Sequence, residues 1–349
     1  MSNISWIAIP AAIAAGAIGS GFLIKRYSAG TYCYEKGRLD GKIAIVTGCN
    51  VGIGLQTVGE LARRGCTVIM ACRNMDKTLE AKKKILEMYS NEKYKTYQVN
   101  NKSLVEDYTE IKDSQLIPIK LDLSDLKSVT KFVQEFSKSQ PKCDLLICNA
   151  GVMMCPYQET ADGFEMQMGT NHLGHCLLVE LLNGKLEKSD EPRVVMVSSM
   201  AHRFYDIDIE NFLLKKENYS PYVAYSNSKL ANVLYAKHLS ARNPSSKLLA
   251  FSLHPGAVRT DLQRHFNIIL RSLFKLGGYL FTKSPWEGSQ TTIFCSLAPK
   301  EKLSSGSYYA DCKLAKCSDI AKDQLSADKF VLNSLTMLKE TPSCKDLFA

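Results

Sequence analysis

The sequence predicts an α/β protein with a doubly wound parallel sheet, built as a single domain behind an N-terminal membrane segment. Past residue 40, short apolar runs alternate with longer amphipathic stretches, which is the order of strands and helices in such a sheet. Most of the short runs are almost continuously apolar, as expected of parallel strands buried on both faces. The chain of 349 residues is also long enough for one sizeable core.

Seven apolar runs qualify as strands. They are residues 42–48, 66–72, 116–123, 143–151, 193–199, 248–256 and 306–312. Helical patterns fill the gaps, and the helix after the third strand is predicted to begin with Ser124 as N-cap and Asp125 in its first turn. The polar stretch 90–115 breaks the rhythm, and we interpret it as the end of a helix followed by a surface insertion.

The N-terminus stands apart from the rest of the chain. Residues 4–24 carry no charge and are long enough to span a bilayer, and Lys25 and Arg26 follow at once. The positive-inside rule then predicts an anchor in the endoplasmic reticulum membrane with the body of the protein facing the cytosol. The alternatives are a cleaved signal peptide and a mitochondrial address, with the mitochondrial inner membrane as location. The predicted units are an anchor at 1–26, a linker at 27–40, a domain at 41–320 and a C-terminal tail or helix at 321–349.

Composition excludes some classes of function. The net charge of +9 is compatible with contact to anionic membranes or phosphates. No dense run of Lys and Arg with interleaved aromatic residues indicates a nucleic-acid partner. The 12 cysteines include no CxxC pair and many lie in apolar runs, so we expect reduced core thiols rather than a zinc site or a disulfide framework.

The glycine-rich stretch "TGCNVGIG" follows the first predicted strand and opens a helix. Glycines there permit a tight turn and let backbone N–H groups approach a pyrophosphate at the helix N-terminus. The spacing is GxxxGxG, which is weak evidence alone and stronger between a strand and a helix. The candidate cofactor-binding residues of this turn are Gly48, Cys49, Asn50, Val51, Gly52, Ile53 and Gly54.

The end of the second predicted strand, "MACRN", bears on the choice of cofactor. NAD binders place an acidic residue here to hold the ribose 2′-hydroxyl, whereas an arginine accommodates the 2′-phosphate of NADP. No Asp or Glu lies within 68–74, and Arg73 is in place, so NADP is favoured over the alternative of an ordinary surface arginine. Asp122, at the end of the third strand, could accept a hydrogen bond from the adenine amino group; a helix-leading aspartate is an equal alternative.

The stretch "AYSNSK" places Tyr225 and Lys229 at i and i+4 of a helix predicted to begin at Ser220 and Pro221. A nearby ammonium stabilises a phenolate and lowers the tyrosine pKa toward neutrality, which suits an acid–base catalyst. The alternative, a surface Tyr–Lys pair, is common. The three residues between the two are interpreted as polar filler.

Position strengthens this interpretation. Parallel strands bring their carboxyl ends to one edge of the sheet, where ligands bind in doubly wound folds. Ser199, whose hydroxyl could bind a substrate carbonyl, lies at such an end. The "NAG" turn could support a ribose of the cofactor here, whereas without this context it would be interpreted as a simple turn. Predicted at this edge are the glycine turn, Arg73, Asp122, the turn of Asn149, Ala150 and Gly151, Ser199, and the "HPG" turn at 254–256.

These motifs together resemble the short-chain dehydrogenase/reductase family, which has a Rossmann fold. The resemblance covers about 40–320 and rests on TGxxxGIG, NAG, NxxG, SS and YxxxK in order. The segments 149–178, 225–239 and 254–265 are similar to the retinol dehydrogenase 11–14 group, and the residues before the first strand are most similar to member 13. Two departures are Cys49 and Val51, where the family usually has Ala and Thr.

The resemblance implies a catalytic tetrad of Asn171, Ser199, Tyr225 and Lys229. Tyr225 would donate the proton, Ser199 would bind and polarise the substrate oxygen, and Lys229 would bind the nicotinamide ribose and tune Tyr225. Asn171 would hold a water that links Lys229 to solvent, and Ser198 is the alternative serine. The resemblance also implies that the cofactor contacts include Tyr225, Lys229, Pro255, Gly256, Val258 and Thr260.

The segment 261–284 is rich in large apolar residues and is interpreted as a lid for an apolar substrate, with an ordinary core helix pair as the alternative. The leading hypothesis is a membrane-anchored, NADP(H)-dependent oxidoreductase of an apolar aldehyde or ketone and its alcohol, with retinal and retinol as the pair that the family suggests. The alternatives are a carbonyl reductase of lipids, steroids or xenobiotics, and a catalytically idle NADP-binding scaffold. No metal is expected, and a homo-oligomer is compatible with the sequence.

Overall fold

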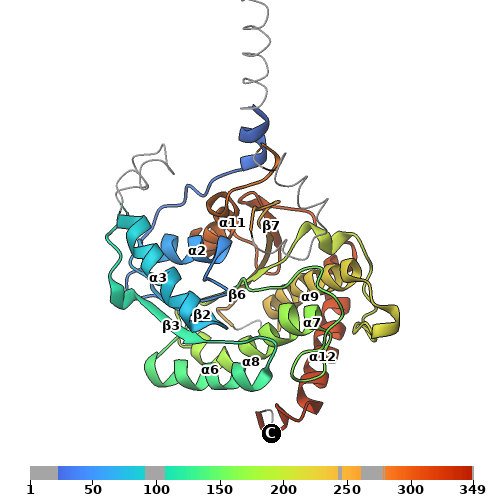
Figure 1. Ribbon diagram of the computed structural model, residues 1–349. Helices are drawn as coiled ribbons and strands as arrows, with labels where there is room; N and C mark the ends of the chain where they lie inside the picture. Colours follow the sequence, from blue (N-terminus) through green and yellow to red (C-terminus); the bar gives the residue numbers. More distant parts are fainter. Residues whose placement is uncertain (1–22, 91–106, 243–245, 261–277, 279, 348–349) are drawn as a thin grey trace, which may run out of the picture.

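The computed structural model describes residues 23–90, 107–242, 246–260, 278 and 280–347. Its centre is an eight-stranded sheet in the order β3-β2-β1-β4-β5-β6-β7-β8, parallel from β3 to β7 with β8 antiparallel at one edge (Figure 1). The strands are β1 Ile43–Thr47, β2 Thr67–Cys72, β3 Leu116–Lys120, β4 Leu145–Cys148, β5 Arg193–Val197, β6 Leu249–His254, β7 Tyr308–Ala310 and β8 Lys313–Leu314. The predicted α/β class with a doubly wound, mostly parallel sheet is confirmed, as are all seven predicted strands, and β8 was not predicted.

Helices cover both faces of the sheet. One layer holds α2 (Gly52–Ala62), α3 (Met75–Ser90) and α11 (Pro285–Leu297), and α11 packs on α2. The other layer holds α6 (Leu126–Ser139), α8 (Gly174–Leu186) and α9 (Pro221–Ala241), with α12 (Gln324–Glu340) packed on α9 (Figure 1). The shorter helical segments are α7 Met166–Met168, the π-helix η2 Gly169–Leu173, and the 3₁₀ turns η1 Asp113–Gln115, η3 Met200–Arg203, η4 Lys216–Asn218, η6 Lys300–Lys302, η7 Ile320–Lys322 and η8 Lys345–Leu347.

The two helix layers explain the apolar strands. Along β1, Ile43 and Ile45 pack into the core on the α6–α8–α9 side, while Ala44 and Val46 pack into the core on the α2–α3–α11 side. Every residue of β1 is buried, as is every residue of β5. Because side chains alternate between faces, a strand covered on both faces is apolar at most positions. The polar exceptions, Thr47 and Arg193, lie at strand ends, where their side chains form hydrogen bonds.

The start of α6 corrects one prediction. Asp125, not Ser124, is the N-cap, because its carboxylate accepts hydrogen bonds from the backbone N–H groups of Lys127 and Ser128. The Ser124 hydroxyl instead donates to Asp122 Oδ1 at 2.6 Å. The helix therefore begins one residue later than predicted.

The N-terminal part of the described chain lies along α11. Residues 23–29 are helical, and Lys25 Nζ bonds Glu287 Oε2 at 2.8 Å and the Thr282 carbonyl at 3.1 Å. No helix among the described residues is long and apolar enough to cross a membrane. The predicted anchor at 1–26, the insertion at 90–115 and the lid at 261–284 lie mostly outside the described residues, so these remain predictions.

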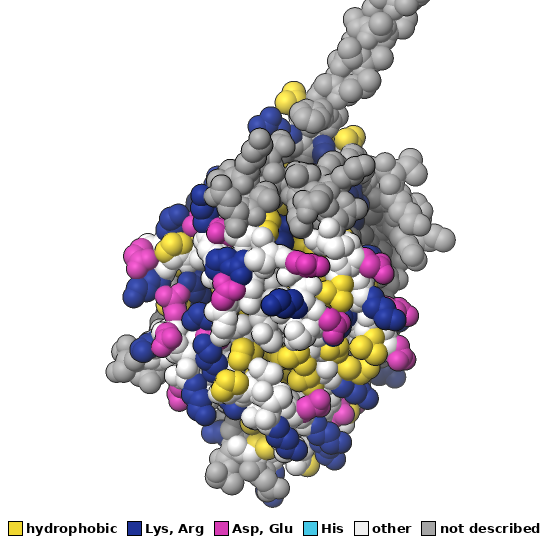
Figure 2. All heavy atoms as spheres, turned by 90° about the vertical axis from the view of Figure 1, so that its left-hand side faces the viewer, with side chains coloured by type: hydrophobic (Ala, Val, Ile, Leu, Met, Phe, Trp, Pro, Cys, Tyr) yellow, Lys and Arg dark blue, Asp and Glu magenta, His cyan; other side chains and the backbone are white. Residues whose placement is uncertain are grey.

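The surface at the left of Figure 1 carries charge of both signs. Figure 2 shows Lys and Arg side chains interspersed with Asp and Glu over this face. The net charge of +9 is therefore not gathered into one basic field on the described part of this face.

Gly54 provides a test of the glycine turn. A Cβ on Gly54 would lie 2.5 Å from the Gly48 carbonyl oxygen and 2.6 Å from Asn149 Nδ2, whereas a Cβ on Gly184, exposed in α8, would meet nothing within 4 Å. We expect Gly54→Ala to lower the free energy of unfolding by about 2 kcal/mol or more, since the turn must shift. Gly184→Ala should raise it by roughly 0.5–1 kcal/mol. Urea denaturation of both variants gives the comparison, and equal midpoints would contradict the tight packing of this turn.

Candidate active site

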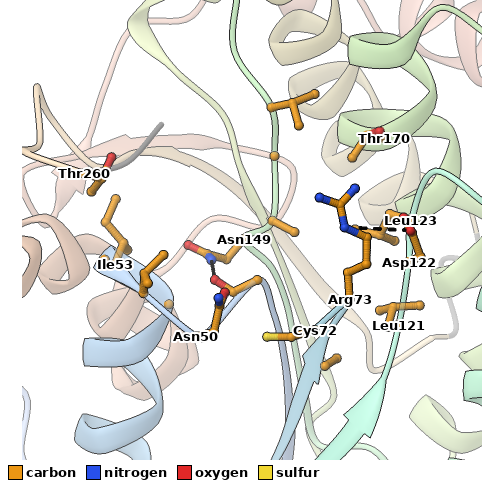
Figure 3. Close-up of a pocket in the computed structure, with 18 residues that line it drawn as sticks. Asn50, Ile53, Cys72, Arg73, Leu121, Asp122, Leu123, Asn149, Thr170 and Thr260 are labelled. Atoms are coloured by element: carbon orange, nitrogen blue, oxygen red, sulfur yellow. Dashed lines mark hydrogen bonds and ion pairs between the residues drawn. The ribbon is translucent and has the colours of Figure 1, made fainter. Parts of the chain in front are cut away.

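A cavity lies at the carboxyl ends of β1, β2, β3 and β4 (Figure 3). The predicted cofactor residues that line it are Gly48, Asn50, Val51, Gly52, Ile53, Gly54, Arg73, Asp122, Asn149, Ala150, Gly151 and Thr260. The sequence interpretation missed Ala71, Cys72, Leu121, Leu123, Val152 and Thr170, which complete the wall. Five of these residues lie at strand ends beside the predicted ones, and Thr170 comes from the π-helix η2, so their place in the wall depends on how the elements pack.

Other predicted cofactor residues do not line this cavity: Cys49, Pro255, Gly256, Val258, Tyr225 and Lys229. Cys49 is fully buried behind the glycine turn, so its side chain is a correction to the predicted set. Val258 is also buried and packs against α11, where a Cβ on Gly288 would lie 2.6 Å from it. Tyr225 and Lys229 lie on α9, which packs on β5 and β6.

The glycine turn brings backbone groups to the cavity. Gly48 and Gly52 have φ values of +64° and +62°, which disfavour side chains, and a Cβ on Gly48 would lie 2.7 Å from the Ala150 Cα. α2 begins directly afterwards, and its N-cap Val51 offers no side-chain hydrogen bond. The cavity wall here is therefore backbone N–H groups and the positive end of a helix dipole, which suit a phosphate group.

Arg73 and Asp122 lie next to each other on one side of the cavity (Figure 3). Their closest atoms, Arg73 Nε and Asp122 Oδ2, are 3.9 Å apart, and the arginine side chain is 71% exposed. Ser124 holds the other carboxylate oxygen of Asp122 through its N–H and its hydroxyl. Because Asp125 caps α6, Asp122 is not a helix cap. The pair offers a mobile guanidinium and a fixed carboxylate to a ligand.

The "NAG" turn is more than a simple turn. Asn149 Nδ2 donates to the backbone carbonyls of Thr47 at 2.8 Å and Gly48 at 3.1 Å. The Thr47 hydroxyl in turn accepts hydrogen bonds from the N–H groups of Asn149 and Ala150, both at 2.9 Å. These bonds lock the ends of β1 and β4 together and hold the glycine turn in place.

Ser199, Tyr225 and Lys229 meet where β5 ends against α9. Tyr225 is 5% exposed and Lys229 is 3% exposed, and Lys229 Nζ lies 5.8 Å from the centroid of the Tyr225 ring. The Ser198 hydroxyl donates to the Lys229 carbonyl at 2.7 Å, which commits it to the helix backbone. This contact favours Ser199 over Ser198 as the serine available to a substrate.

The pKa values correct the predicted tuning of Tyr225. Burial raises the pKa of Tyr225 to about 12, and a hydrogen bond to the Ser199 hydroxyl acts in the opposite direction. Burial also lowers the pKa of Lys229 to about 8. Lys229 Nζ donates to the Val197 carbonyl at 3.1 Å and lies over the ring face. Desolvation by burial is therefore the largest effect on the pKa of both groups in this structure.

Asn171 lies in the π-helix η2, and its side chain is fully engaged. Oδ1 accepts a hydrogen bond from the Val152 N–H at 2.8 Å, while Nδ2 donates to the Val152 carbonyl and to the Ser228 hydroxyl, both at 2.9 Å. A Cβ on Gly151 would lie 3.0 Å from Asn171 Oδ1 and 3.3 Å from Lys229 Nζ, so both groups converge there. A water linked to Lys229 would thus need an acceptor on Asn171, since both amide hydrogens are used.

The residues between Tyr225 and Lys229 are not polar filler. Ser226, Asn227 and Ser228 are all buried. The Ser228 hydroxyl donates to the Tyr225 carbonyl at 2.8 Å and accepts from Asn171, and the Ser226 hydroxyl donates to the Ala201 carbonyl. These residues are buried because α9 is covered on most of its sides, and they could not be predicted because Ser and Asn are typical of an exposed surface.

His175 joins the two halves of the site and was not singled out from the sequence. Burial lowers its pKa to about 4, so the ring is neutral at pH 7. Its Nδ1 lies 3.0 Å from the Asn171 carbonyl, which only accepts, so Nδ1 carries the hydrogen. Its Nε2, 2.9 Å from the Thr47 hydroxyl, must then accept. His175 thereby ties the π-helix to the end of β1.

His175→Phe should cost more stability than the matched variant His172→Phe. Both imidazoles are fully buried, but His172 packs between the rings of Tyr235 and Phe330, and its Nε2 lies 3.2 Å from the Ser334 hydroxyl. We expect His175→Phe to lower the free energy of unfolding by about 2–4 kcal/mol, because it strands two buried polar groups, and His172→Phe by about 1 kcal/mol. Chemical denaturation measures both, and the reverse ranking would contradict this network.

Comparisons with known proteins agree with this geometry. A family model described as short chain dehydrogenase matches residues 42–106 and 97–268. Mouse retinol dehydrogenase 11 is 40% identical over 304 residues, covering 87% of this chain and 88% of that protein. Bovine retinol dehydrogenase 12 is 39% identical, covering 88% and 89%, and mouse retinol dehydrogenase 13 is 37% identical, covering 90% and 89%.

Solved structures show the same fold. A Mycobacterium paratuberculosis protein described as uncharacterized has a TM-score of 0.65 and 31% identity, covering 88% of this chain and 97% of its own. A Shigella flexneri protein assigned as a short chain dehydrogenase, solved with NADP, has a TM-score of 0.56 and 20% identity, covering 79% and 99%. The second likeness shows the fold alone.

Proposed function

Because the chain belongs to the short-chain dehydrogenase family and is an oxidoreductase acting on CH–OH groups, we propose that it interconverts an apolar aldehyde or ketone and its alcohol with NADP(H). Retinal and retinol are the leading pair, since the matched relatives are named retinol dehydrogenases. The observation that carries the proposal is the meeting of Ser199, Tyr225 and Lys229 at the same sheet edge as the glycine-lined cavity.

The residues of the cavity fit a dinucleotide with a 2′-phosphate. The glycine turn leaves backbone room for the diphosphate at the start of α2, where a Cβ on Gly48 or Gly54 would collide with the chain. Arg73 presents a largely exposed guanidinium to the cavity and would pair with the 2′-phosphate. No acidic residue lies within 68–74 to hold a 2′-hydroxyl instead. Asp122 would accept from the adenine amino group.

NADPH, when bound, supplies the hydride. In the proposed reaction the Tyr225 hydroxyl donates its proton to the carbonyl oxygen, which the Ser199 hydroxyl also binds. The raised pKa of Tyr225 keeps the phenol protonated at neutral pH, as a proton donor requires. Lys229, whose pKa is lowered to about 8, stays largely charged at pH 7 and would stabilise the phenolate left after transfer.

A substrate panel tests this proposal. Purified full-length protein is assayed with retinal, aliphatic aldehydes and steroid ketones, each with NADPH and with NADH. We expect reduction of retinal with NADPH to give the highest kcat/KM. Turnover of steroids or short aldehydes alone would replace the retinoid proposal with the broader carbonyl reductase. Cofactor binding without turnover of any carbonyl would indicate an NADP-binding scaffold.

The anchor and its location are also proposals. The uncharged stretch 4–24, followed by Lys25 and Arg26, supports a membrane anchor at 1–26 with the catalytic body facing the cytosol. Fluorescence microscopy of the full chain and of a chain lacking 1–26 tests it. We expect the full chain at the endoplasmic reticulum and a diffuse truncated chain; a mitochondrial signal would support the alternative address.

A further inference from the structure

Two cysteine thiols touch directly behind the cofactor cavity. Cys49 follows Gly48 in the glycine turn, and Cys72 is the last residue of β2. Their sulfur atoms are 3.5 Å apart, and the Cys49 N–H donates to the Cys72 sulfur at 3.1 Å. The parallel pairing of β1 with β2 sets this contact, because the Gly48 N–H bonds the Ala71 carbonyl at 2.9 Å.

The two thiols differ in acidity. The hydrogen bonds that Cys72 accepts from the Cys49 thiol and backbone N–H outweigh its burial and lower the pKa of Cys72 to about 7. Burial raises the pKa of Cys49 well above its ordinary value. Burial likewise raises the pKa values of Cys66 and Cys148, which lie in the same sheet region. Cys72 is thus the most acidic of these four thiols and the one that most readily forms the thiolate, which is the form that reacts with oxidants.

Cys72 also has a route to solvent. It lines the cavity beside Arg73 (Figure 3), while Cys49 lies fully buried behind the turn. A small oxidant that enters the cavity would meet the Cys72 sulfur first and find the Cys49 thiol directly behind it. This is the arrangement of an attacking thiolate with a resolving thiol.

We propose that Cys49 and Cys72 are a peroxide-reactive pair whose closure to a disulfide weakens cofactor binding. The Cys72 thiolate attacks one oxygen of hydrogen peroxide, the O–O bond breaks, and the released hydroxide takes up a proton to form water. Cys49 sulfur then attacks the Cys72 sulfenic acid, the S–O bond breaks, and the hydroxyl leaves with the Cys49 proton as a second water. The two thiols supply the two electrons, and a dithiol reductant reverses the change.

The effect on the cavity follows from packing, and it rests on the proposed function of this cavity as the NADP(H) site. A disulfide brings the two sulfurs closer by about 1.5 Å and so pulls Cys49 toward β2. Gly54, in the first turn of α2, is packed tightly against Cys49, since a Cβ on Gly54 would lie 2.8 Å from the Cys49 Cα. A movement of Cys49 should therefore move this turn as well. The N–H groups that face the cofactor phosphates therefore move with Cys49.

The test combines peptide mass spectrometry with a binding assay on the full-length protein. Hydrogen peroxide is added, free thiols are alkylated under denaturing conditions, and NADPH affinity is measured by fluorescence before and after. We expect a Cys49–Cys72 cross-linked peptide, a loss of NADPH affinity of about tenfold or more, and recovery of both with dithiothreitol. Cys66→Ala should keep the cross-link as a matched control. Cys49→Ala should lose it, and its NADPH affinity, whatever the starting value, should no longer fall reversibly with peroxide.

The outcomes separate this inference from the proposed function. Reduced protein that binds NADPH but forms no Cys49–Cys72 cross-link with peroxide overturns the inference and leaves the function standing. A cross-link that forms without change in NADPH affinity overturns the claim about the cavity. A cross-link in a protein whose reduced form binds no NADPH supports the thiol chemistry and overturns the proposed function.

Discussion

Tyr225→Phe is expected to lower kcat for carbonyl reduction by about 10²–10⁴-fold, the range that a positioned general acid contributes. The ring stays buried at its place on α9 and only the hydroxyl is lost, so NADPH affinity should change little. Stopped-flow or steady-state kinetics with NADPH, together with a separate binding titration, distinguish the two effects.

Tyr235→Phe is the matched control for this variant. It lies on the same helix, is fully buried, and donates from its hydroxyl to Glu180 at 2.8 Å and toward the Cys176 carbonyl at 3.3 Å, away from Ser199. Its loss should cost about 1–3 kcal/mol of stability and leave kcat near that of the parent. Equal turnover by the Tyr225→Phe protein would refute the assignment of Tyr225 as proton donor.

Arg73→Asp is expected to weaken NADPH binding by about 10–100-fold while changing NADH binding far less. The estimate follows from the loss of a charge-assisted hydrogen bond to a phosphate, roughly 1.5–3 kcal/mol, and the new carboxylate adds repulsion. The side chain is free to reorient, being 71% exposed and 3.9 Å from its nearest acidic partner Asp122. Titration of both cofactors measures the ratio of dissociation constants.

Lys131→Asp controls for the change in net charge. Lys131 is exposed on α6 and does not line the cavity, so its reversal alters the overall charge equally without touching the site. NADPH affinity should change little in this variant at physiological ionic strength, where surface charges are screened. An unchanged preference for NADPH in Arg73→Asp would defeat the 2′-phosphate assignment.

The fold could be predicted because its strongest determinants are local. Strands buried on both faces are apolar at nearly every position, and the glycines at 48 and 52 have a positive φ that few other residues tolerate. β8 escaped prediction because it is two exposed residues, Lys313 and Leu314, defined only by pairing with β7. The N-cap of α6 was misplaced by one residue because Ser124 and Asp125 are both good caps, and the competing bond to Asp122 decides between them.

Only the polar residues and glycines at strand ends could be predicted as parts of the site. Polar residues and glycines at predicted strand ends were enough to identify Arg73, Asp122 and the glycine turn. His175 and Ser228 do not, since their roles come from contacts with residues distant in sequence. Burial also raises the pKa of Tyr225 and lowers that of Lys229, and burial is a property of the packed molecule rather than of a motif. The Cys49–Cys72 contact likewise needs the register of β1 against β2.

The most direct measurement of the central claim follows the hydride itself. The purified protein is incubated with retinal and NADPH carrying deuterium at the nicotinamide C4 position, on either face in separate reactions, and the alcohol is analysed by mass spectrometry. The proposed function requires deuterium on the carbinol carbon from one face of the nicotinamide, with little product from the Tyr225→Phe protein. Alcohol that carries no deuterium from either face, or an equal yield from Tyr225→Phe, would contradict it.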